Sequence, residues 1–342
     1  MDKKYWKHWT EPNGILITNI PMNWQYRNPV VDSRTEKPPY SFEPYENAIG
    51  CFQLSCYQLE KSSQNRNKQT DNQTSESKWM SSREDSDEFD MYLYFGAMDD
   101  QALICKYIYR RELRGDTRIL EQLKLVDKVL KRIKVIPIRD RPLAANLDKY
   151  DRFLASLVAS HDLLDAAINS GSYIEIVVIA TNQIDAFLRL SIVLAKQLSD
   201  QTDDIEVKYL FQGDDEKGIL ERKIFREAVK LGVIDTKTEE RLNGLYDFRN
   251  RVIHRYIISL IRTYDMIPAI SELLDVHEEI RLALRVLEDR QIGKGFGIYG
   301  RGFQRLEDRD EVAIAVERKR AESMANDKHV LDRFRRKIGI GE

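Results

Sequence analysis

The chain has 342 residues, 42% of them hydrophobic and 32% charged, which is enough for two domains and predicts a largely soluble, helix-rich protein. A formal net charge of −2 excludes a protein that coats nucleic acid by bulk charge, so any affinity for phosphates must come from local basic patches. The three cysteines (Cys51, Cys56 and Cys105) do not have the spacing of zinc ligands and favour a reducing, cytoplasmic location.

Residues 1–116 are predicted to form a β-rich domain. Strand-like patterns occur in four segments: 14–20, 47–59, 89–95 and 102–109. The last two segments are expected to form a hairpin that turns through residues 96–101, and because both strands are apolar on both faces, we expect a cover on each side of the sheet. A proline-rich connection (28–44) and a polar, disordered loop at about 61–87 separate the strands.

The pattern becomes helical from about residue 117. Residues 117–146 are predicted to form a connecting helix and a turn, and residues 147–290 to form five helices with short connections, which is an all-α bundle. Ser172 is expected to cap the second helix of the bundle. The fourth helix is expected over 236–262, where residues 236 and 239 have the sequence of a capping box, Thr236 with Glu239.

The predicted class is therefore α+β, with a small antiparallel β-sheet domain before a C-terminal helical bundle. The most apolar window, 173–194, carries charges at Glu175, Asp185 and Arg189, which argue against a membrane span. The N-terminal segment lacks the apolar core of a signal peptide, so we expect a cytoplasmic protein without a membrane partner.

Residues 291–342 are predicted to form a glycine-rich hinge and a charged helical tail, the helix at 307–324. Gly295, Gly297 and Gly300 match the GxGxxG spacing of dinucleotide-binding loops, but a charged helix precedes them where that motif needs a strand. The run is therefore interpreted as a hinge or linker. In this interpretation RNA bases are touched by side chains of the run: Phe296, Tyr299, Arg301 and Phe303.

The segment FRNRVIHRY, residues 248–256, places arginines, an asparagine and a histidine on one helix. Asn250 and His254 are i,i+4 neighbours on one face, and the long side chain of Arg249 can reach round the helix towards them. An apolar stripe is expected to be buried beside this polar set: Leu245, Phe248, Val252, Ile253, Ile257 and Leu260. The polar set is thus expected in a groove between two helices. On spacing alone, arginines lying along a core stripe and a surface histidine explain the pattern better than catalysis does, because RxxxxH is short enough to occur by chance.

The segment from Arg249 to Tyr256 resembles the signature of the HEPN superfamily, in the RxxxxHxY form of HEPN toxins that pair with minimal nucleotidyltransferases. Residues 242–250 are similar to the lead-in to that motif, and residues 166–190 are similar to the first helical hairpin of the family. The resemblance covers roughly residues 147–290.

The resemblance implies a metal-independent endoribonuclease that dimerises so that two motifs face one cleft. It assigns catalysis to Arg249, Asn250 and His254, with no metal or cofactor, and makes Tyr256 a target for modification by a separate nucleotidyltransferase or a residue of the cleft. The chemistry suits these side chains, because imidazole can act as base and acid near neutral pH and a guanidinium can stabilise a phosphorane.

Other charged residues are weaker candidates. Asp185 and Arg189 are i,i+4 partners in an apolar helix, which predicts a buried ion pair and leaves open a polar wall of the cleft. Exposed basic residues are candidates for steering RNA: Arg222, Arg226, Arg251 and Arg255.

Three functions remain open. The first is an RNA-cleaving enzyme, a toxin or antiviral defence effector regulated by its N-terminal domain or by a partner such as an antitoxin. The second is a non-catalytic HEPN-like module for dimerisation or nucleotide binding. The third is a signalling receptor whose N-terminal domain binds a ligand and gates the bundle.

Overall fold

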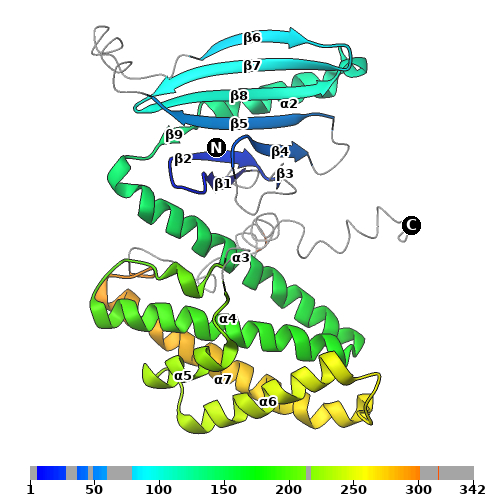
Figure 1. The fold of residues 1–342 in the computed structure, drawn as a ribbon, viewed down its shortest axis with the longest axis vertical. Helices are drawn as coiled ribbons and strands as arrows, with labels where there is room; N and C mark the ends of the chain where they lie inside the picture. Colours follow the sequence, from blue (N-terminus) through cyan, green and yellow to red (C-terminus); the bar gives the residue numbers. More distant parts are fainter. Residues whose placement is uncertain are drawn as a thin grey trace. The chain divides into compact units, whose positions relative to one another are not determined.

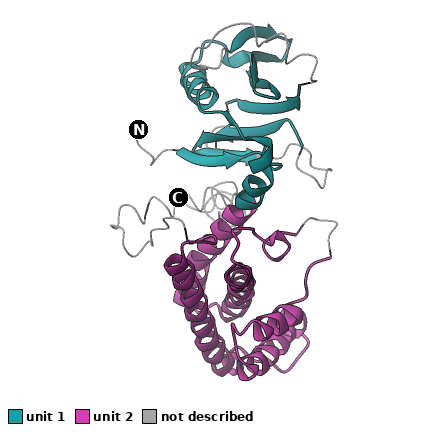
Figure 2. Ribbon diagram, turned by 90° about the vertical axis from the view of Figure 1, so that its left-hand side faces the viewer, with its two compact units in different colours: residues 1–148 teal, residues 149–342 magenta. Residues whose placement is uncertain are grey.

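A computed structural model describes residues 6–27, 37–44, 49–59, 79–212 and 217–300, together with residue 315. The chain divides into two compact units, Met1–Asp148 and Lys149–Glu342, which Figure 2 distinguishes by colour. Unit 1 contains antiparallel sheets and one long helix, and unit 2 is helical. The predicted α+β class is therefore confirmed.

Unit 1 is built on two antiparallel sheets (Figure 1). The larger has the strand order β3-β4-β5-β8-β7-β6 and the smaller has the order β1-β2-β9. The strands are β1 (Trp6–Thr10), β2 (Leu16–Pro21), β3 (Trp24–Arg27), β4 (Tyr40–Pro44), β5 (Cys51–Gln58), β6 (Met80–Asp85), β7 (Phe89–Met98), β8 (Gln101–Arg110) and β9 (Lys134–Val135).

Helix α2 (Thr117–Leu130) packs against the large sheet in unit 1. The carboxylate of Asp116 caps its first turn by accepting from the backbone N–H of Arg118 at 2.8 Å. Its apolar face joins the core of the unit through Ile119, Val126, Val129 and Leu130. The segment 117–146 was expected to connect two domains, but its helix contributes to the core of unit 1 because its apolar face covers one face of the sheet.

The predicted hairpin is formed by β7 and β8, with a turn at Asp99, whose φ is 50°. Gly96 was expected in the turn but pairs with Leu103 inside the strands, where the ring of Trp79 lies so close that a Cβ would approach it to 2.9 Å. Burial alternates along β8, and its outer residues, such as Lys106, are only partly buried. Within the described residues, the expected cover on the second face of the sheet is therefore incomplete.

Strand β6 lies inside the segment that was predicted to be a disordered loop, so that prediction is wrong for residues 80–85; residues 60–78 lie outside the described residues. All six residues of β6 are exposed, and the strand pairs with β7 from Met80 opposite Phe95 to Asp85 opposite Asp90. A polar edge strand needs only one paired neighbour and buries little, so its composition resembles that of a loop.

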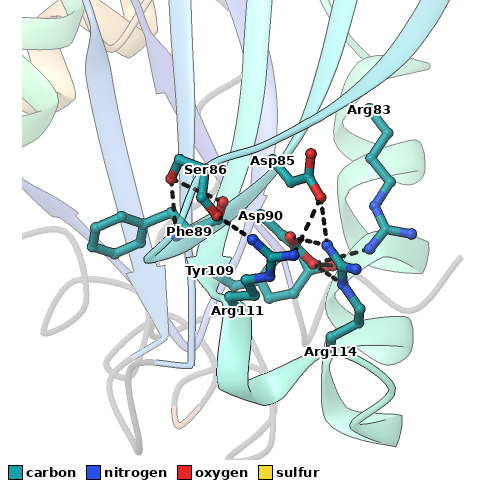
Figure 3. A network of polar contacts seen from close by, with 8 residues as sticks. All are labelled: Arg83, Asp85, Ser86, Phe89, Asp90, Tyr109, Arg111 and Arg114. Atoms are coloured by element: carbon teal, nitrogen blue, oxygen red, sulfur yellow. Dashed lines mark hydrogen bonds and ion pairs between the residues drawn. The ribbon is translucent and has the colours of Figure 1, made fainter.

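A buried carboxylate organises this edge of the sheet (Figure 3). Asp90 accepts hydrogen bonds from Arg114 Nε at 2.7 Å, Arg83 Nη2 at 2.9 Å and Tyr109 Oη at 3.1 Å. Arg114 also donates to Asp85 of β6 at 2.9 Å. The hydrogen bonds from Arg114 hold the pKa of Asp90 well below its usual range, with Arg83 and Tyr109 adding to the effect.

Unit 2 is a bundle of long helices around one apolar core, with α4 at its centre. The helices are α3 (Arg141–Ser170), whose first two turns belong to unit 1, α4 (Tyr173–Asp200), α5 (Glu221–Lys230), α6 (Thr236–Arg255) and α7 (Ile267–Lys294). Among the described helices, α4 is the one with the length and apolarity of a membrane span, and 67% of that window is buried inside the protein, as in the core helix of a globular domain.

Two predictions about helix ends are wrong. Asp235, and not Thr236, is the N-cap of α6, and its carboxylate accepts from the backbone N–H of Thr238 at 2.7 Å. The helix also ends at Arg255 instead of residue 262. Ile257 and Leu260, which were expected in the buried stripe, therefore lie beyond the helix and are exposed. Ser172 is the N-cap of α4 as predicted, although its side chain makes no capping bond.

The glycine run is folded against unit 2, which contradicts the hinge interpretation. Gly297 N–H donates to Asp203 Oδ1 at 2.8 Å, and Tyr299 N–H donates to Gln291 Oε1 at 3.1 Å. Tyr299 is buried, with its hydroxyl 3.0 Å from that of Tyr150, so it is unavailable to RNA bases. A Cβ at Gly300 would lie 2.1 Å from a backbone nitrogen, which explains the glycine. The predicted contacts of Arg301 and Phe303, and the tail helix, lie outside the described residues.

Candidate active site at the end of helix α6

The segment from Arg249 to Tyr256 occupies the last two turns of α6 and the first residue after the helix. Leu242, Leu245 and Val252 face the core, Arg249 and Asn250 are half-buried, and His254 is exposed. The helix is therefore amphipathic, with the motif spread from the border of the buried face to solvent.

Arg249 is held by its neighbours on the same helix. Its Nη1 donates to Asn250 Oδ1 at 2.9 Å, and its guanidinium carbon lies 5.5 Å from the centre of the Tyr246 ring. The Tyr246 hydroxyl donates to Glu221 Oε2 on α5 at 3.0 Å; burial and this carboxylate raise the pKa of Tyr246. The guanidinium is therefore positioned by contacts within the protein.

Arg249 also lines a small cavity between α4, α5 and α6, with Leu273 of α7 completing its wall; the space open to water-sized molecules is about 30 Å³. Polar side chains meet there from all three helices, and the lining residues are Thr181, Asn182, Ile184, Asp185, Glu221, Phe225, Leu242, Leu245, Tyr246, Arg249 and Leu273. The expected groove between helices therefore exists beside Arg249.

Asp185 forms an ion pair and also lines the cavity. The ion pair is the predicted one, in which Asp185 accepts from Arg189 Nε at 2.6 Å. Arg189 Nη2 donates to the Ile219 carbonyl at 2.9 Å, which fixes the pair. Burial raises the pKa of Asp185, and Arg189 opposes that effect.

His254 lies apart from this cavity. Its side chain is exposed, it is absent from the cavity lining, and no described residue forms a hydrogen bond with its ring. A single chain therefore places the guanidinium of Arg249 at a cavity and the imidazole of His254 on the open surface. Of the three residues expected in one groove, Arg249 lines the cavity, whereas Asn250 and His254 do not.

Tyr256 follows the end of α6 and is half-buried against the core of unit 2. Its hydroxyl lies 2.8 Å from Thr263 Oγ1 in the short helix before α7, and either atom can be the donor. The hydroxyl is near the surface, as a site of modification requires.

The basic candidates differ in their surroundings. Arg222 pairs with Asp247 and lies over the Tyr246 ring, 5.8 Å from its centre, so part of its charge is neutralised. Arg251 lies 5.9 Å from the Phe248 ring centre. Arg226 and Arg255 are exposed on α5 and α6.

Exposed apolar side chains occur in the last turn of α6 and along the segment that leads to α7, and this set is here named the α6 apolar end. Its members are Ile253, Ile257, Ile258, Leu260, Tyr264 and Ile267. Ile257 is 95% exposed and Leu260 is 97% exposed, whereas both were expected in the core. Several large apolar side chains exposed together are typical of an interaction surface.

Four cavity residues were missed from the sequence: Thr181, Asn182, Glu221 and Tyr246. Asn182 precedes Asp185 by three residues, and Tyr246 precedes Arg249 by three, so helical spacing places each pair on one face. Glu221 carries no such signal, because only the packing of α5 against α6 brings it to Tyr246. No group of three or more potential metal ligands is gathered within the described part of the chain.

No family model matches this chain, and neither does any curated protein. Solved structures that match include a protein of Bacteroides thetaiotaomicron VPI-5482, 11% identical, with a TM-score of 0.27. The match spans 73% of this chain and 80% of that one. This similarity is too distant to transfer a fold or a function.

Proposed function

We propose that the chain is a metal-independent endoribonuclease of the HEPN type, working as a cytoplasmic homodimer. The observation that carries the proposal is the guanidinium of Arg249, held by Asn250 and Tyr246 beside a cavity, five residues along α6 from the exposed imidazole of His254. Guanidinium and imidazole are the groups needed to cleave RNA without a metal.

In the proposed reaction, one imidazole removes the proton of a 2′-hydroxyl, whose oxygen then attacks the adjacent phosphorus. The bond from phosphorus to the 5′-oxygen breaks, and a second, protonated imidazole donates its proton to that oxygen. Arg249 stabilises the charge on the phosphorane through its Nη atoms. The products are a 2′,3′-cyclic phosphate and a 5′-hydroxyl.

The need for a second imidazole supports the homodimer. One motif supplies one histidine, and the α6 apolar end lies directly beside it. Burying this cluster against a second copy would remove it from water and bring two copies of His254 towards one cleft. The same proposal includes a role as a toxin or defence effector. It also includes regulation by unit 1, by an antitoxin or by a nucleotidyltransferase that acts at Tyr256. These parts of the proposal rest on the family resemblance.

The alternative is a non-catalytic module for dimerisation or nucleotide binding. One observation favours it: His254 lies outside the cavity that Arg249 lines. A signalling receptor gated by unit 1 is a further alternative that rests on the sequence alone.

Incubation of the purified protein with total RNA separates these functions. We expect the wild-type protein to degrade RNA and the His254→Ala variant to degrade it at least about 10²-fold more slowly. The matched control is the His8→Ala variant, which alters an exposed histidine of unit 1 and should degrade RNA at the wild-type rate. Equal rates for the His254 variant and wild type would reject the assignment, and absence of cleavage by wild type would favour the non-catalytic module.

A further inference from the structure

Arg249 forms no ion pair within the described part of the chain, although two carboxylates line the cavity beside it. One of them, Asp185, is already paired with Arg189 at 2.6 Å. The other, Glu221, is therefore the carboxylate of the cavity that could pair with Arg249. Arginine and carboxylate form strong, often bidentate pairs, so the absence of a pair between Arg249 and Glu221 needs a physical cause.

Tyr246 contacts both members of the pair that does not form. Its hydroxyl donates to Glu221 Oε2 at 3.0 Å, across the contact between α6 and α5. The guanidinium carbon of Arg249 lies 5.5 Å from the centre of the same ring, within the range of a cation–π contact. The carboxylate is thus bound at the hydroxyl and the guanidinium at the ring, and one tyrosine holds the two charges apart.

Asn250 joins Tyr246 to Arg249. Its Oδ1 accepts from Arg249 Nη1 at 2.9 Å, and its side chain also bonds to Tyr246. Because the hydroxyl proton of Tyr246 is donated to Glu221, the hydroxyl oxygen accepts from the amide nitrogen of Asn250. Donors therefore point in one direction from Arg249 to Glu221, and hydrogen bonds arranged in such a chain strengthen one another.

We propose that Tyr246 is a positioning residue for the reaction: its hydroxyl occupies Glu221, which would otherwise pair with Arg249 and draw the guanidinium away from Asn250 and from the phosphate. The inference rests on the proposed function, in which Arg249 stabilises the phosphorane, and adds to it a residue outside the segment from Arg249 to Tyr256. Tyr246 acts through Arg249 and needs no contact with RNA. Removing its hydroxyl should therefore have an effect that depends on the charge at Glu221.

The cleavage test is a double-mutant cycle. The Tyr246→Phe variant keeps the ring and removes the hydroxyl, and we expect single-turnover RNA cleavage to be about tenfold slower, the scale of one hydrogen bond to a charged group. In a Glu221→Gln background the same change should slow cleavage by less than about twofold, because a neutral amide does not capture a guanidinium. A tyrosine with a merely structural role would cost the same factor in both backgrounds. Tyr173→Phe, at the first residue of α4, is the matched control and should cleave at the wild-type rate.

Binding provides a second measurement that needs no cleavage. A fluorescently labelled DNA oligonucleotide lacks the 2′-hydroxyl, and its dissociation constant for each protein of the cycle is measured by anisotropy. We expect Tyr246→Phe to weaken binding several-fold in the wild-type background, because a misplaced guanidinium loses a phosphate contact. The weakening should disappear in the Glu221→Gln background.

The outcomes distinguish the role of Tyr246 from the proposed function. RNA cleavage with equal loss in both backgrounds, or with no loss, would overturn the role of Tyr246 and leave the nuclease standing. A wild-type protein that binds the oligonucleotide with the expected pattern but cuts no RNA would support the control of Arg249 by Tyr246 and overturn the nuclease. Absence of both cleavage and the binding pattern would overturn both.

Discussion

Arg249 donates through Nη1 to the side-chain oxygen of Asn250, its neighbour on α6, at 2.9 Å. This bond fixes the guanidinium and aligns the amide of Asn250. If holding Arg249 is the role of Asn250, the Asn250→Ala variant should cleave RNA about 10- to 100-fold more slowly, because a hydrogen bond to a charged group contributes about 1.5–3 kcal/mol. The Asn250→Asp variant keeps the acceptor and should recover much of the rate. Equal loss in both variants, measured in single-turnover cleavage, would show that the amide nitrogen is required instead, through its bond with Tyr246 or through the substrate.

The α6 apolar end should hold two copies of the chain together. Replacing Ile257 by Glu puts a charge where an apolar side chain would be buried, and burial of such a side chain contributes about 1.5–3 kcal/mol. The dissociation constant should therefore rise about tenfold or more in analytical ultracentrifugation. Val286→Glu, at an exposed position on α7, is the control and should leave association unchanged. A monomeric wild-type protein that still cuts RNA would reject the composite site.

A buried histidine should make the stability of unit 2 depend on pH. His277 Nε2 lies 2.7 Å from Gln183 Oε1, and burial, aided by His161 and Arg281 and opposed by Glu278, lowers the pKa of His277 from 6.5 to about 4. Between these values the unfolded chain binds a proton that the folded chain does not, so the free energy of unfolding should fall as pH falls from 6.5 to 4, by roughly 3 kcal/mol.

The His277→Gln variant tests this assignment, because glutamine keeps a neutral donor but cannot take up a proton. Its free energy of unfolding, from urea titrations at several pH values, should depend less on pH in this window than that of the wild-type protein. Parallel pH profiles for the two proteins would assign the dependence to other groups.

In unit 1, Asp90 should stabilise strand β6 through its bonds to Arg114 and Arg83. The pKa of Asp90 in the folded protein is depressed, mainly by Arg114. The contribution of Asp90 to the free energy of unfolding is therefore present above about pH 4, the pKa of an aspartate in the unfolded chain, and is lost as the pH falls below that value. Asp90→Asn should lower the melting temperature by several degrees at pH 7 and increase hydrogen exchange in residues 80–85. The exposed pair of Arg110 and Glu112, 3.5 Å apart, is the matched control: Glu112→Gln should change neither quantity. An unchanged exchange rate in Asp90→Asn would contradict this role.

The elements that could be predicted from the sequence are those whose buried apolar residues recur with the period of a strand or a helix. Long apolar patterns in the sequence allowed four of the elements to be predicted: β7, β8, α4 and α7. Strand β6 was missed because its side chains are all exposed, and its position depends on pairing and on a carboxylate five residues beyond the strand. The end of α6 was predicted too late because Ile257, Ile258 and Leu260 continue an apolar run although the chain leaves the helix.

The candidate site was predictable only along single helices. The pair of Asp185 and Arg189 follows from helical spacing, because the two residues are i,i+4 partners. The contact between the adjacent residues Arg249 and Asn250 does not follow from it, and the sequence had instead placed Asn250 beside His254. The cavity depends on how α4, α5 and α6 pack, and periodicity within one helix carries no information about that. For the same reason, the exposure of His254 outside the cavity was not foreseen.

The most direct test of the central claim is the chemistry of the ends that the protein leaves on a defined RNA in the presence of EDTA. Catalysis by Arg249 and His254 predicts undiminished cleavage, 2′,3′-cyclic phosphate and 5′-hydroxyl ends, and resistance of a substrate with deoxyribose at the cut. Loss of activity on chelation, or cleavage of DNA at the same rate as RNA, would contradict the account.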